Sequence, residues 1–178
     1  MKDQKLHRMI LGALFAALCA VATLVIQVPS PMNGYVNLGD CVVLLSGWLL
    51  GPLYGGLAAG IGSMLADVMT GYVHYAPGTL LIKGAMALAA ALLYRMWKAA
   101  AKGHPLTGRI LSGMAAEALM VAGYFGYASL LLGKGWAAAA SIPGNLIQGV
   151  FGLLSAVLFM QMFAKSEAMK RYFSGLMQ

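Results

Sequence analysis

The feature that most constrains this chain is a series of long apolar stretches with almost no charged residues. The first runs from Met9 to Val28, and later ones cover residues 41–66, 76–97, 110–132 and 142–164. A helix that crosses a bilayer needs about 20 mainly apolar residues. Because 61% of the residues are hydrophobic and only 10% are charged, a water-soluble fold would expose large apolar patches. The pattern predicts an all-α integral membrane protein and excludes an ordinary soluble enzyme.

The number of membrane spans depends on the apolar region 41–66. Gly51-Pro52 lies in its middle, and proline both removes a backbone donor and clashes with the preceding helical turn. The region therefore forms either one long helix or two short ones. Lys and Arg gather on the cytoplasmic side of membrane proteins. Only two short helices place all three basic clusters on that side: Lys2, Lys5 and Arg8; Arg95, Lys98, Lys102 and Arg109; and Lys165, Lys170 and Arg171.

We therefore expect a single domain over residues 1–178, folded as a six-helix membrane bundle with both termini in the cytoplasm. The expected spans are about 9–28, 40–51, 53–68, 76–97, 109–132 and 142–164. A cleavable signal peptide is the alternative for the N-terminus, because Ala20-Val21-Ala22 resembles a cleavage site, but the apolar run continues six residues beyond it. Membrane orientation explains the excess of basic residues, so no nucleic-acid partner is expected.

In this topology the polar side chains of the spans gather on the outer side. Asp40 lies at the outer mouth of the second span and Asp67 near the outer end of the third. Lys83 lies about 10 Å below the outer start of the fourth span, and the outer half of the sixth adds Asn145 and Gln148. Ionisable groups in lipid are costly and usually mark a function or a buried pair.

The fifth span and two outer loops add further polar side chains. The fifth span carries Glu117, Tyr124 and Tyr127 as a stripe at helical spacing, with Glu117 the deepest. The loop over residues 29–39 includes Asn33, Tyr35 and Asn37, and the loop over residues 70–78 includes Tyr72, His74 and Tyr75. Together these residues predict a pocket open to the outside, with apolar walls and a few placed polar groups.

Structural explanations stay open for the same residues. Asp67 and Lys83 can neutralise each other across adjacent helices, and Asp40 can be a helix N-cap. The loop tyrosines can form an interfacial aromatic belt, and the two amides of the sixth span can join helices. His74 fits a loop residue better than a metal ligand, because no second His or Cys lies at a metal-binding spacing.

Missing sequence motifs exclude several kinds of protein. The sequence has no GxxxxGK[ST] motif, so the chain does not itself hydrolyse a nucleotide. It has no HExxH motif, and no histidine lies within an expected span to activate a serine. We expect no catalytic residue, no metal site and no cofactor.

The first span carries small residues in two parallel rows. Gly12, Ala16 and Ala20 form one row, and Ala13 and Ala17 form the other. Small residues spaced by four positions let helix backbones approach closely. Such a row either packs inside the bundle or docks a partner protein.

Four segments carry a resemblance to one family of membrane proteins. They are GYVNLGD at 34–40, LGPLYGG at 50–56, GIGSMLAD at 60–67 and YAPGTLLIKG at 75–84. Together they resemble the substrate-binding S component of an energy-coupling factor (ECF) vitamin transporter, in the branch named for riboflavin transport. The motif match covers residues 34–84. The rest of the chain agrees in span count, orientation and length.

This resemblance implies a six-helix subunit of the bacterial plasma membrane that captures a micronutrient from outside. Such a subunit docks on a transmembrane coupling protein, the T component, which is attached to two cytoplasmic ATPases. The loops that close over ligand in the family correspond here to residues 29–39 and 68–78. The AxxxA docking motif of the first helix corresponds to Ala13/Ala17 or Ala16/Ala20.

The resemblance and the outer polar residues together define the expected substrate site. The family's pocket positions correspond to Asn37, Asp40, Asp67 and Lys83. The full expected set is Asn37, Asp40, Asp67, His74, Tyr75, Lys83, Tyr124, Asn145 and Gln148. These side chains suit a small, flat, polar heterocycle. A vitamin B6 vitamer is the first choice, with hydroxymethylpyrimidine, a queuosine precursor and riboflavin as alternatives.

Two other classes of protein are alternatives to a transporter subunit. A stand-alone secondary carrier of a small polar solute would be expected to contain inverted repeats, and the sequence shows no convincing internal repeat. A membrane enzyme or a structural membrane partner is the other class. An enzyme would convert its ligand, whereas a binding subunit would return it unchanged.

Overall fold

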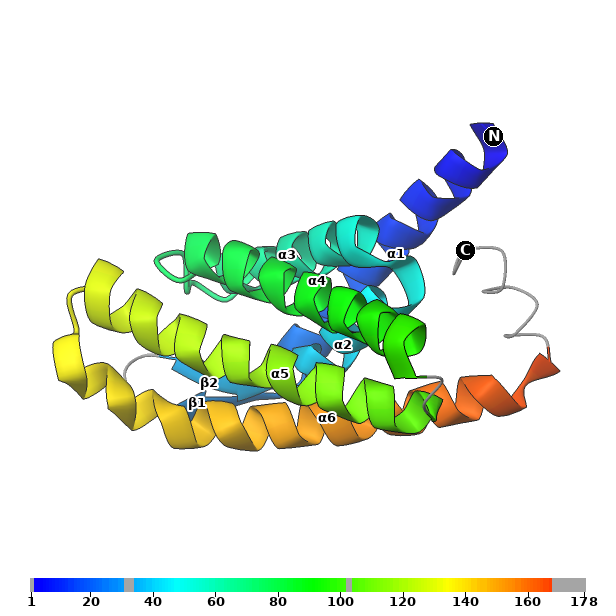
Figure 1. Ribbon diagram of the computed structural model, residues 1–178. Helices are drawn as coiled ribbons and strands as arrows, with labels where there is room; N and C mark the ends of the chain where they lie inside the picture. The colour runs from blue at the N-terminus through cyan, green and yellow to red at the C-terminus, as the bar shows by residue number, and fades with distance from the viewer. Residues whose placement is uncertain (1, 31–33, 102–103, 168–178) are drawn as a thin grey trace.

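The computed structural model describes residues 2–30, 34–101 and 104–167, and all structural statements concern these residues. Asn33, Lys102, Lys170 and Arg171, which entered the sequence argument, lie outside them. The chain is mostly helical (Figure 1). Its α-helices are α1 (Lys2–Val25), α2 (Gly39–Leu50), α3 (Pro52–Met69), α4 (Ala76–Ala101), α5 (Pro105–Gly126) and α6 (Ile142–Lys165).

Four helical segments are long and apolar enough to cross a membrane: Lys5–Val25, Ala76–Ala100, Pro105–Leu131 and Gly135–Lys165. Helix α2 is apolar but has only 12 residues. Many large apolar side chains on the outer faces of the longer helices are exposed, among them Leu14, Phe151 and Leu158. Exposed apolar surface on this scale fits helices that face lipid. Six membrane spans and the orientation of the termini stay predictions.

The break between α2 and α3 falls at Gly51-Pro52. Gly51 has a φ of 83°, a backbone conformation that glycine adopts without the strain of a side chain. Pro52 begins α3, where its missing N–H removes no helical hydrogen bond and its fixed φ suits the first turn. Two short helices therefore replace one long one because the backbone reverses at Gly51 and restarts at Pro52.

Helix α2 lies at the centre of the bundle. Every residue of α2 except Val42 is buried, and α2 packs against α1, α3, α4 and α6. Gly47 lies directly against the backbone carbonyl of Ala87 on α4, so no Cβ fits between these helices. The apolar core includes Leu44, Met86 and Met120 from α2, α4 and α5, all fully buried. This packing leaves α2 with little surface for lipid.

An antiparallel hairpin connects α1 to α2. It consists of β1 (Gln27–Ser30) and β2 (Gly34–Asn37), with Gln27 opposite Asn37 and Val28 opposite Val36. Residues 29–39 were expected to form a loop, and the structure places β-strands in most of the described part of this range. The alternation of Val36 with Tyr35 and Asn37 gives β2 one apolar and one polar side. The hairpin lies beside α6 (Figure 1).

The connections from α3 to α4 and from α5 to α6 lie at the same end of the bundle (Figure 1). The loop between α3 and α4 is at this end, as are a π-helix, η1 (Tyr127–Leu131), and a 3₁₀-helix, η2 (Gly135–Ser141), which join α5 to α6. The beginning of α1 and the end of α6 lie at the opposite end (Figure 1). A second apolar cluster, Tyr75, Ala128 and Ala138, packs the loop end together.

Candidate functional site

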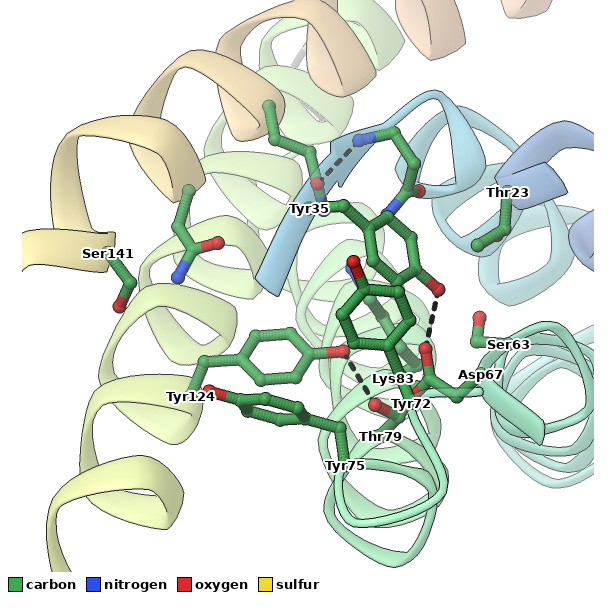
Figure 2. A pocket seen from close by; sticks show the side chains of 13 residues that line it. Thr23, Tyr35, Ser63, Asp67, Tyr72, Tyr75, Thr79, Lys83, Tyr124 and Ser141 are labelled. Carbon is green, nitrogen blue, oxygen red and sulfur yellow. Dashed lines mark hydrogen bonds between the residues drawn. The ribbon is translucent and has the colours of Figure 1, made fainter. Parts of the chain in front are cut away.

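A pocket lies near the loop end of the bundle, between the hairpin and the helices (Figure 2). Every α-helix except α2 contributes to its wall, together with β2, the α3–α4 loop and η2. The cavity volume is about 50 Å³. Its lining residues are Thr23, Tyr35, Asn37, Ser63, Asp67, Tyr72, Tyr75, Thr79, Lys83, Tyr124, Ser141, Asn145 and Gln148. The lining combines four phenol rings with amides, hydroxyls and charged groups.

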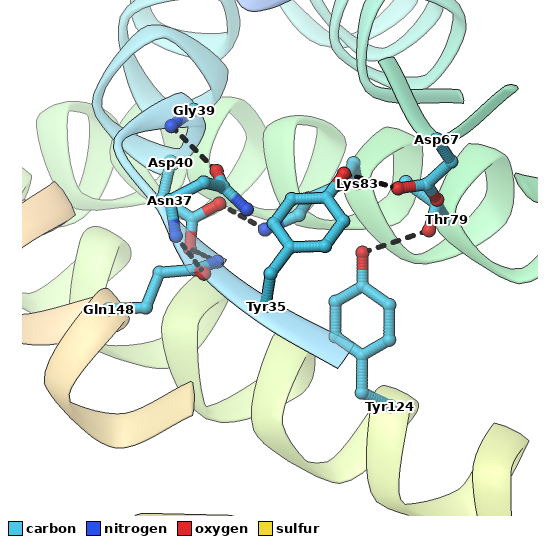
Figure 3. A network of polar contacts seen from close by, with 9 residues as sticks. All are labelled: Tyr35, Asn37, Gly39, Asp40, Asp67, Thr79, Lys83, Tyr124 and Gln148. Atoms are coloured by element: carbon cyan, nitrogen blue, oxygen red, sulfur yellow. Dashed lines mark hydrogen bonds and ion pairs between the residues drawn. The ribbon is translucent and has the colours of Figure 1, made fainter. Parts of the chain in front are cut away.

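A polar network at the base of the pocket joins the hairpin to three helices (Figure 3). The Lys83 ammonium on α4 forms an ion pair with Asp40 on α2. The Gln148 Nε2 donates to Asp40 Oδ2 at 2.7 Å, and its Oε1 accepts from the Asn37 backbone N–H at 2.8 Å. Asn37 Oδ1 in turn accepts from the Gly39 N–H at 2.8 Å. One amide, Gln148, therefore links the ion pair to the end of the hairpin.

This network corrects two sequence-based interpretations. Asp67 and Lys83 do not neutralise each other, because Lys83 is paired with Asp40. Thr79, one helical turn before Lys83, lies at the level of Asp67 instead (Figure 3). Asp40 is also not an N-cap, since Leu38 occupies that position and Asp40 lies in the first turn of α2, with its carboxylate on Lys83.

Asp67 on α3 lies in the aromatic part of the pocket. The Tyr35 hydroxyl donates to Asp67 Oδ1 at 2.5 Å, while Oδ2 is buried and has no hydrogen-bond partner within the described chain. The Tyr35 and Tyr72 rings lie 4.8 Å apart between centroids. Burial, with the hydrogen bond to Asp67, raises the pKa of the Tyr35 phenol well above its usual value. Tyr35 therefore stays protonated and keeps donating to the carboxylate.

Comparison with known proteins places the chain in a family. The model of the family described as "ECF-type riboflavin transporter, S component" matches residues 3–165. This chain belongs to that family. The family is one of transporter subunits and not of enzymes. As an S component, the protein is a membrane protein and the substrate-binding subunit of a vitamin-type transporter.

A relative and a solved structure agree with this assignment. A Pyrococcus woesei protein described as "Uncharacterized protein in gap 3'region" is 38% identical over 136 residues, which are 75% of this chain and 86% of that protein. A solved structure described as "Structure and mechanism of the S component of a bacterial ECF transporter" superposes with a TM-score of 0.68. It has 19% sequence identity and covers 91% of this chain and 99% of that one, so the two share a fold.

The pocket of this S component brings together most of the residues expected at the substrate site. Asn37, Asp67, Tyr75, Lys83, Tyr124, Asn145 and Gln148 all line it. Asp40 is fully buried behind Lys83 and contacts no part of the cavity surface. His74 is exposed and does not line the cavity; its ring lies 4.8 Å from that of Tyr75.

Six lining residues were absent from the expected set: Thr23, Tyr35, Ser63, Tyr72, Thr79 and Ser141. Small hydroxyl side chains are common in membrane helices and give little signal in a sequence. One signal was available, because Ser63 and Thr79 each precede an expected site residue by one helical turn. Tyr35, Tyr72 and Tyr75 all line the pocket wall, as the pocket interpretation of the outer loops expects.

The two rows of small residues on α1 have different surroundings. Ala13 and Ala17 are exposed, whereas Ala16 and Ala20 are partly covered. The Ala16 carbonyl lies directly against Gly62 of α3. The row with Ala16 and Ala20 therefore faces the bundle, and the row with Ala13 and Ala17 lies on the surface. Within the described chain, no group of three or more His, Cys, Asp or Glu side chains is arranged to hold a metal ion.

Proposed function

We propose that this S component captures a small vitamin-like heterocycle from outside the cell and delivers it inward after docking on the T component and its two ATPases. The observation that supports this proposal is the pocket itself, whose phenol rings can stack on a flat ring and whose amides and hydroxyls can bind its polar edges. A vitamin B6 vitamer remains the first choice. Hydroxymethylpyrimidine, a queuosine precursor and riboflavin are the alternatives.

The proposed membrane topology has six spans and cytoplasmic termini, in the plasma membrane of a bacterium. Arg95 and Lys98 lie in the C-terminal part of α4, whereas the pocket residues Thr79 and Lys83 lie in its N-terminal part. Basic residues mark the cytoplasmic side, so the pocket end faces outward. The beginning of α1 and the end of α6 lie at the end opposite the pocket (Figure 1), which supports the cytoplasmic placement of both termini.

Ligand entry requires the pocket to open. Its volume of about 50 Å³ is small beside the roughly 300–1,000 Å³ of typical ligand pockets, so a vitamin-sized ligand needs more space. The hairpin strands β1 and β2 and the α3–α4 loop contribute Tyr35, Tyr72 and Tyr75 to the wall. We infer that these two segments move aside to admit the substrate and then cover it. Connecting segments move more readily than packed helices because they have fewer buried contacts.

Docking on the T component is assigned to the exposed row of α1. Ala13 and Ala17 lie on a face that also exposes Ile10, Leu14 and Val21. A surface of small and apolar residues lets a partner helix approach closely within a membrane. Ala16 and Ala20 are the less suitable row, because Ala16 already packs on α3.

The experiment that tests this function is native mass spectrometry of the protein, gently purified from cells grown in rich medium. A bound heterocycle of a few hundred daltons, released unchanged, supports a binding subunit and identifies its substrate. A thermal-shift screen with B6 vitamers, hydroxymethylpyrimidine, a queuosine precursor and riboflavin complements it. A protein that carries no heterocycle and responds to none of these compounds contradicts the proposal and favours a stand-alone carrier.

A further inference from the structure

We propose that the pocket selects a positively charged ligand: a small aromatic molecule with a protonated amino group that donates to the carboxylate of Asp67. The inference rests on the proposed function, because it assigns a chemical class to the substrate of that same pocket. The resemblance of the chain to riboflavin-type S components does not by itself imply a positively charged ligand. It follows from how the buried charges of this pocket are paired.

The first step is the distribution of charge at the pocket. Lys83 is the cation of the pocket wall, and its charge is balanced by Asp40. Both side chains are almost fully buried, with exposed fractions of 3% and 0%. Asp67 is a second buried acid, with 4% exposure. Once Lys83 and Asp40 are paired, Asp67 is left as an acid of the wall that forms no ion pair with a described residue.

The second step is the bonding of Asp67. Its Oδ1 accepts a hydrogen bond from the Tyr35 hydroxyl. Its Oδ2 is buried without a partner in the described chain. Buried polar atoms in proteins nearly always have a hydrogen-bond partner. A carboxylate oxygen only accepts hydrogen bonds, so the group that completes this site is a donor, and a charged donor also offsets the carboxylate.

The third step is the aromatic surroundings of that oxygen. The Tyr35 and Tyr72 rings lie beside Asp67, and the Tyr124 hydroxyl donates to Thr79 at the same level (Figures 2 and 3). Cations bind favourably near the faces of aromatic rings, most of all where water is excluded. Ring faces beside a carboxylate therefore favour an organic ammonium group. An anionic group placed there would be repelled by Asp67.

Other polar groups around the pocket also favour a ligand whose ammonium group lies at Asp67. Ser63 Oγ and Thr23 Oγ1 line the same side of the pocket and are also buried without partners. Hydroxyl oxygens can accept hydrogen bonds from the remaining N–H groups of an ammonium group. Lys134 donates to the Tyr75 hydroxyl at 2.9 Å and lies 5.0 Å from the centre of that ring. This cation at Tyr75 disfavours a second positive charge there, so the ammonium end of the ligand lies at Asp67.

The test uses two probes that differ only in charge at one position. Pyridoxamine carries a protonated aminomethyl group where pyridoxine carries a neutral hydroxymethyl group of almost the same size. Their affinities, with riboflavin as a larger neutral probe, are measured by calorimetry on the full chain, on Asp67→Asn and on Glu117→Gln. Glu117→Gln is the matched control, because it makes the same carboxylate-to-amide change at a buried acid outside the pocket lining. Native mass spectrometry identifies any ligand that co-purifies.

The expected result is pyridoxamine binding at least about tenfold more tightly than pyridoxine, the size of one charge-assisted hydrogen bond. Asp67→Asn should reduce this ratio to near one, and Glu117→Gln should leave it unchanged. A co-purified amine supports the inference in the same way. Equal affinity for the two probes overturns it, as does a neutral co-purified ligand or pyridoxamine binding to Asp67→Asn as tightly as to the wild type. Failure of every probe, without a co-purified heterocycle, instead overturns the proposed function and the inference with it.

Discussion

The ammonium of Lys83 on α4 and the carboxylate of Asp40 on α2 form an ion pair inside the bundle. Gln148 of α6 donates to the same carboxylate, so three helices meet at this one acid. The pair lies just below the pocket, where Lys83 lines the wall and Asp40 does not. It therefore sets the charge of the pocket base and joins α2, α4 and α6 at the same time.

Removing the Asp40 charge should strongly destabilise the protein. In Asp40→Asn the Lys83 ammonium is buried without a counter-ion, and breaking a buried pair in this way costs about 3–5 kcal/mol. We expect a clear fall in the thermal midpoint of the purified protein in mild detergent. The double variant Asp40→Asn/Lys83→Gln should recover part of the loss because it removes both charges. A single variant as stable as the wild type would show that the pair is not formed in the membrane protein.

Removing the Tyr35 hydroxyl should speed ligand release. Tyr35→Phe keeps the ring but loses the bond to Asp67, and a hydrogen bond to a charged group is worth about 1.5–3 kcal/mol. This corresponds to release about 10 to 150 times faster, measured by exchange of bound ligand against labelled ligand. Tyr72→Phe is the control, because it removes a hydroxyl from the neighbouring ring and leaves the Asp67 contact in place. Equal release rates for the two variants would contradict a closing role for Tyr35.

A methyl group at Gly62 should destabilise the contact between α1 and α3. The added Cβ would collide with the Ala16 carbonyl and the Cys19 side chain, and overpacking of this kind costs about 1–3 kcal/mol. Gly126→Ala is the matched substitution, because no other atom lies within 4 Å of its Cβ position. It should leave stability unchanged or raise it by about 0.5–1 kcal/mol. The thermal midpoints of Gly62→Ala and Gly126→Ala are measured side by side. Similar midpoints would argue against close packing at Gly62.

A bulky side chain at Ala17 should block association with the T component but not ligand binding. Ala17 is exposed on α1, so Ala17→Trp changes the surface of the subunit and not its core. We expect co-purification with the coupling complex to fall about tenfold, the effect of about 1.4 kcal/mol, while ligand affinity is kept. Ala16→Leu should instead lower the thermal midpoint, because Ala16 packs against Gly62. Normal association of Ala17→Trp would exclude this face as the docking surface.

Replacing Glu117 should not stop transport if docking and ATP hydrolysis drive it. Glu117 is buried in α5 with neither carboxylate oxygen partnered by a described residue, and it lies outside the pocket lining. The amide of Glu117→Gln has nearly the same size and cannot carry a charge, which would be costly in this environment. Uptake in cells that carry the coupling complex should therefore persist. Loss of uptake in Glu117→Gln, together with dependence on a proton gradient, would favour the stand-alone carrier.

Several features of the fold could be predicted because they are local properties of the chain. The helix break at Gly51-Pro52 follows from the geometry of these two residues, and the long helices follow from runs of apolar side chains. The hairpin was not predicted, since its described strands have only four residues each, too few for a clear alternating pattern. Tyr35 was therefore expected either at the outer pocket or in an aromatic belt, and its hydrogen bond to Asp67 was not predicted.

The sequence by itself determined the class of this protein, its membrane environment and the end of the bundle at which polar residues gather. These properties depend on side-chain polarity and on the length of apolar runs, which need no knowledge of neighbouring helices. Only the tertiary structure decided that Lys83 pairs with Asp40 and not with Asp67, and that Ala17 and not Ala16 faces outward. Such choices depend on how far each helix is rotated about its own axis. That rotation is set by packing at distant residues, such as Gly47 against Ala87 and Gly62 against Ala16.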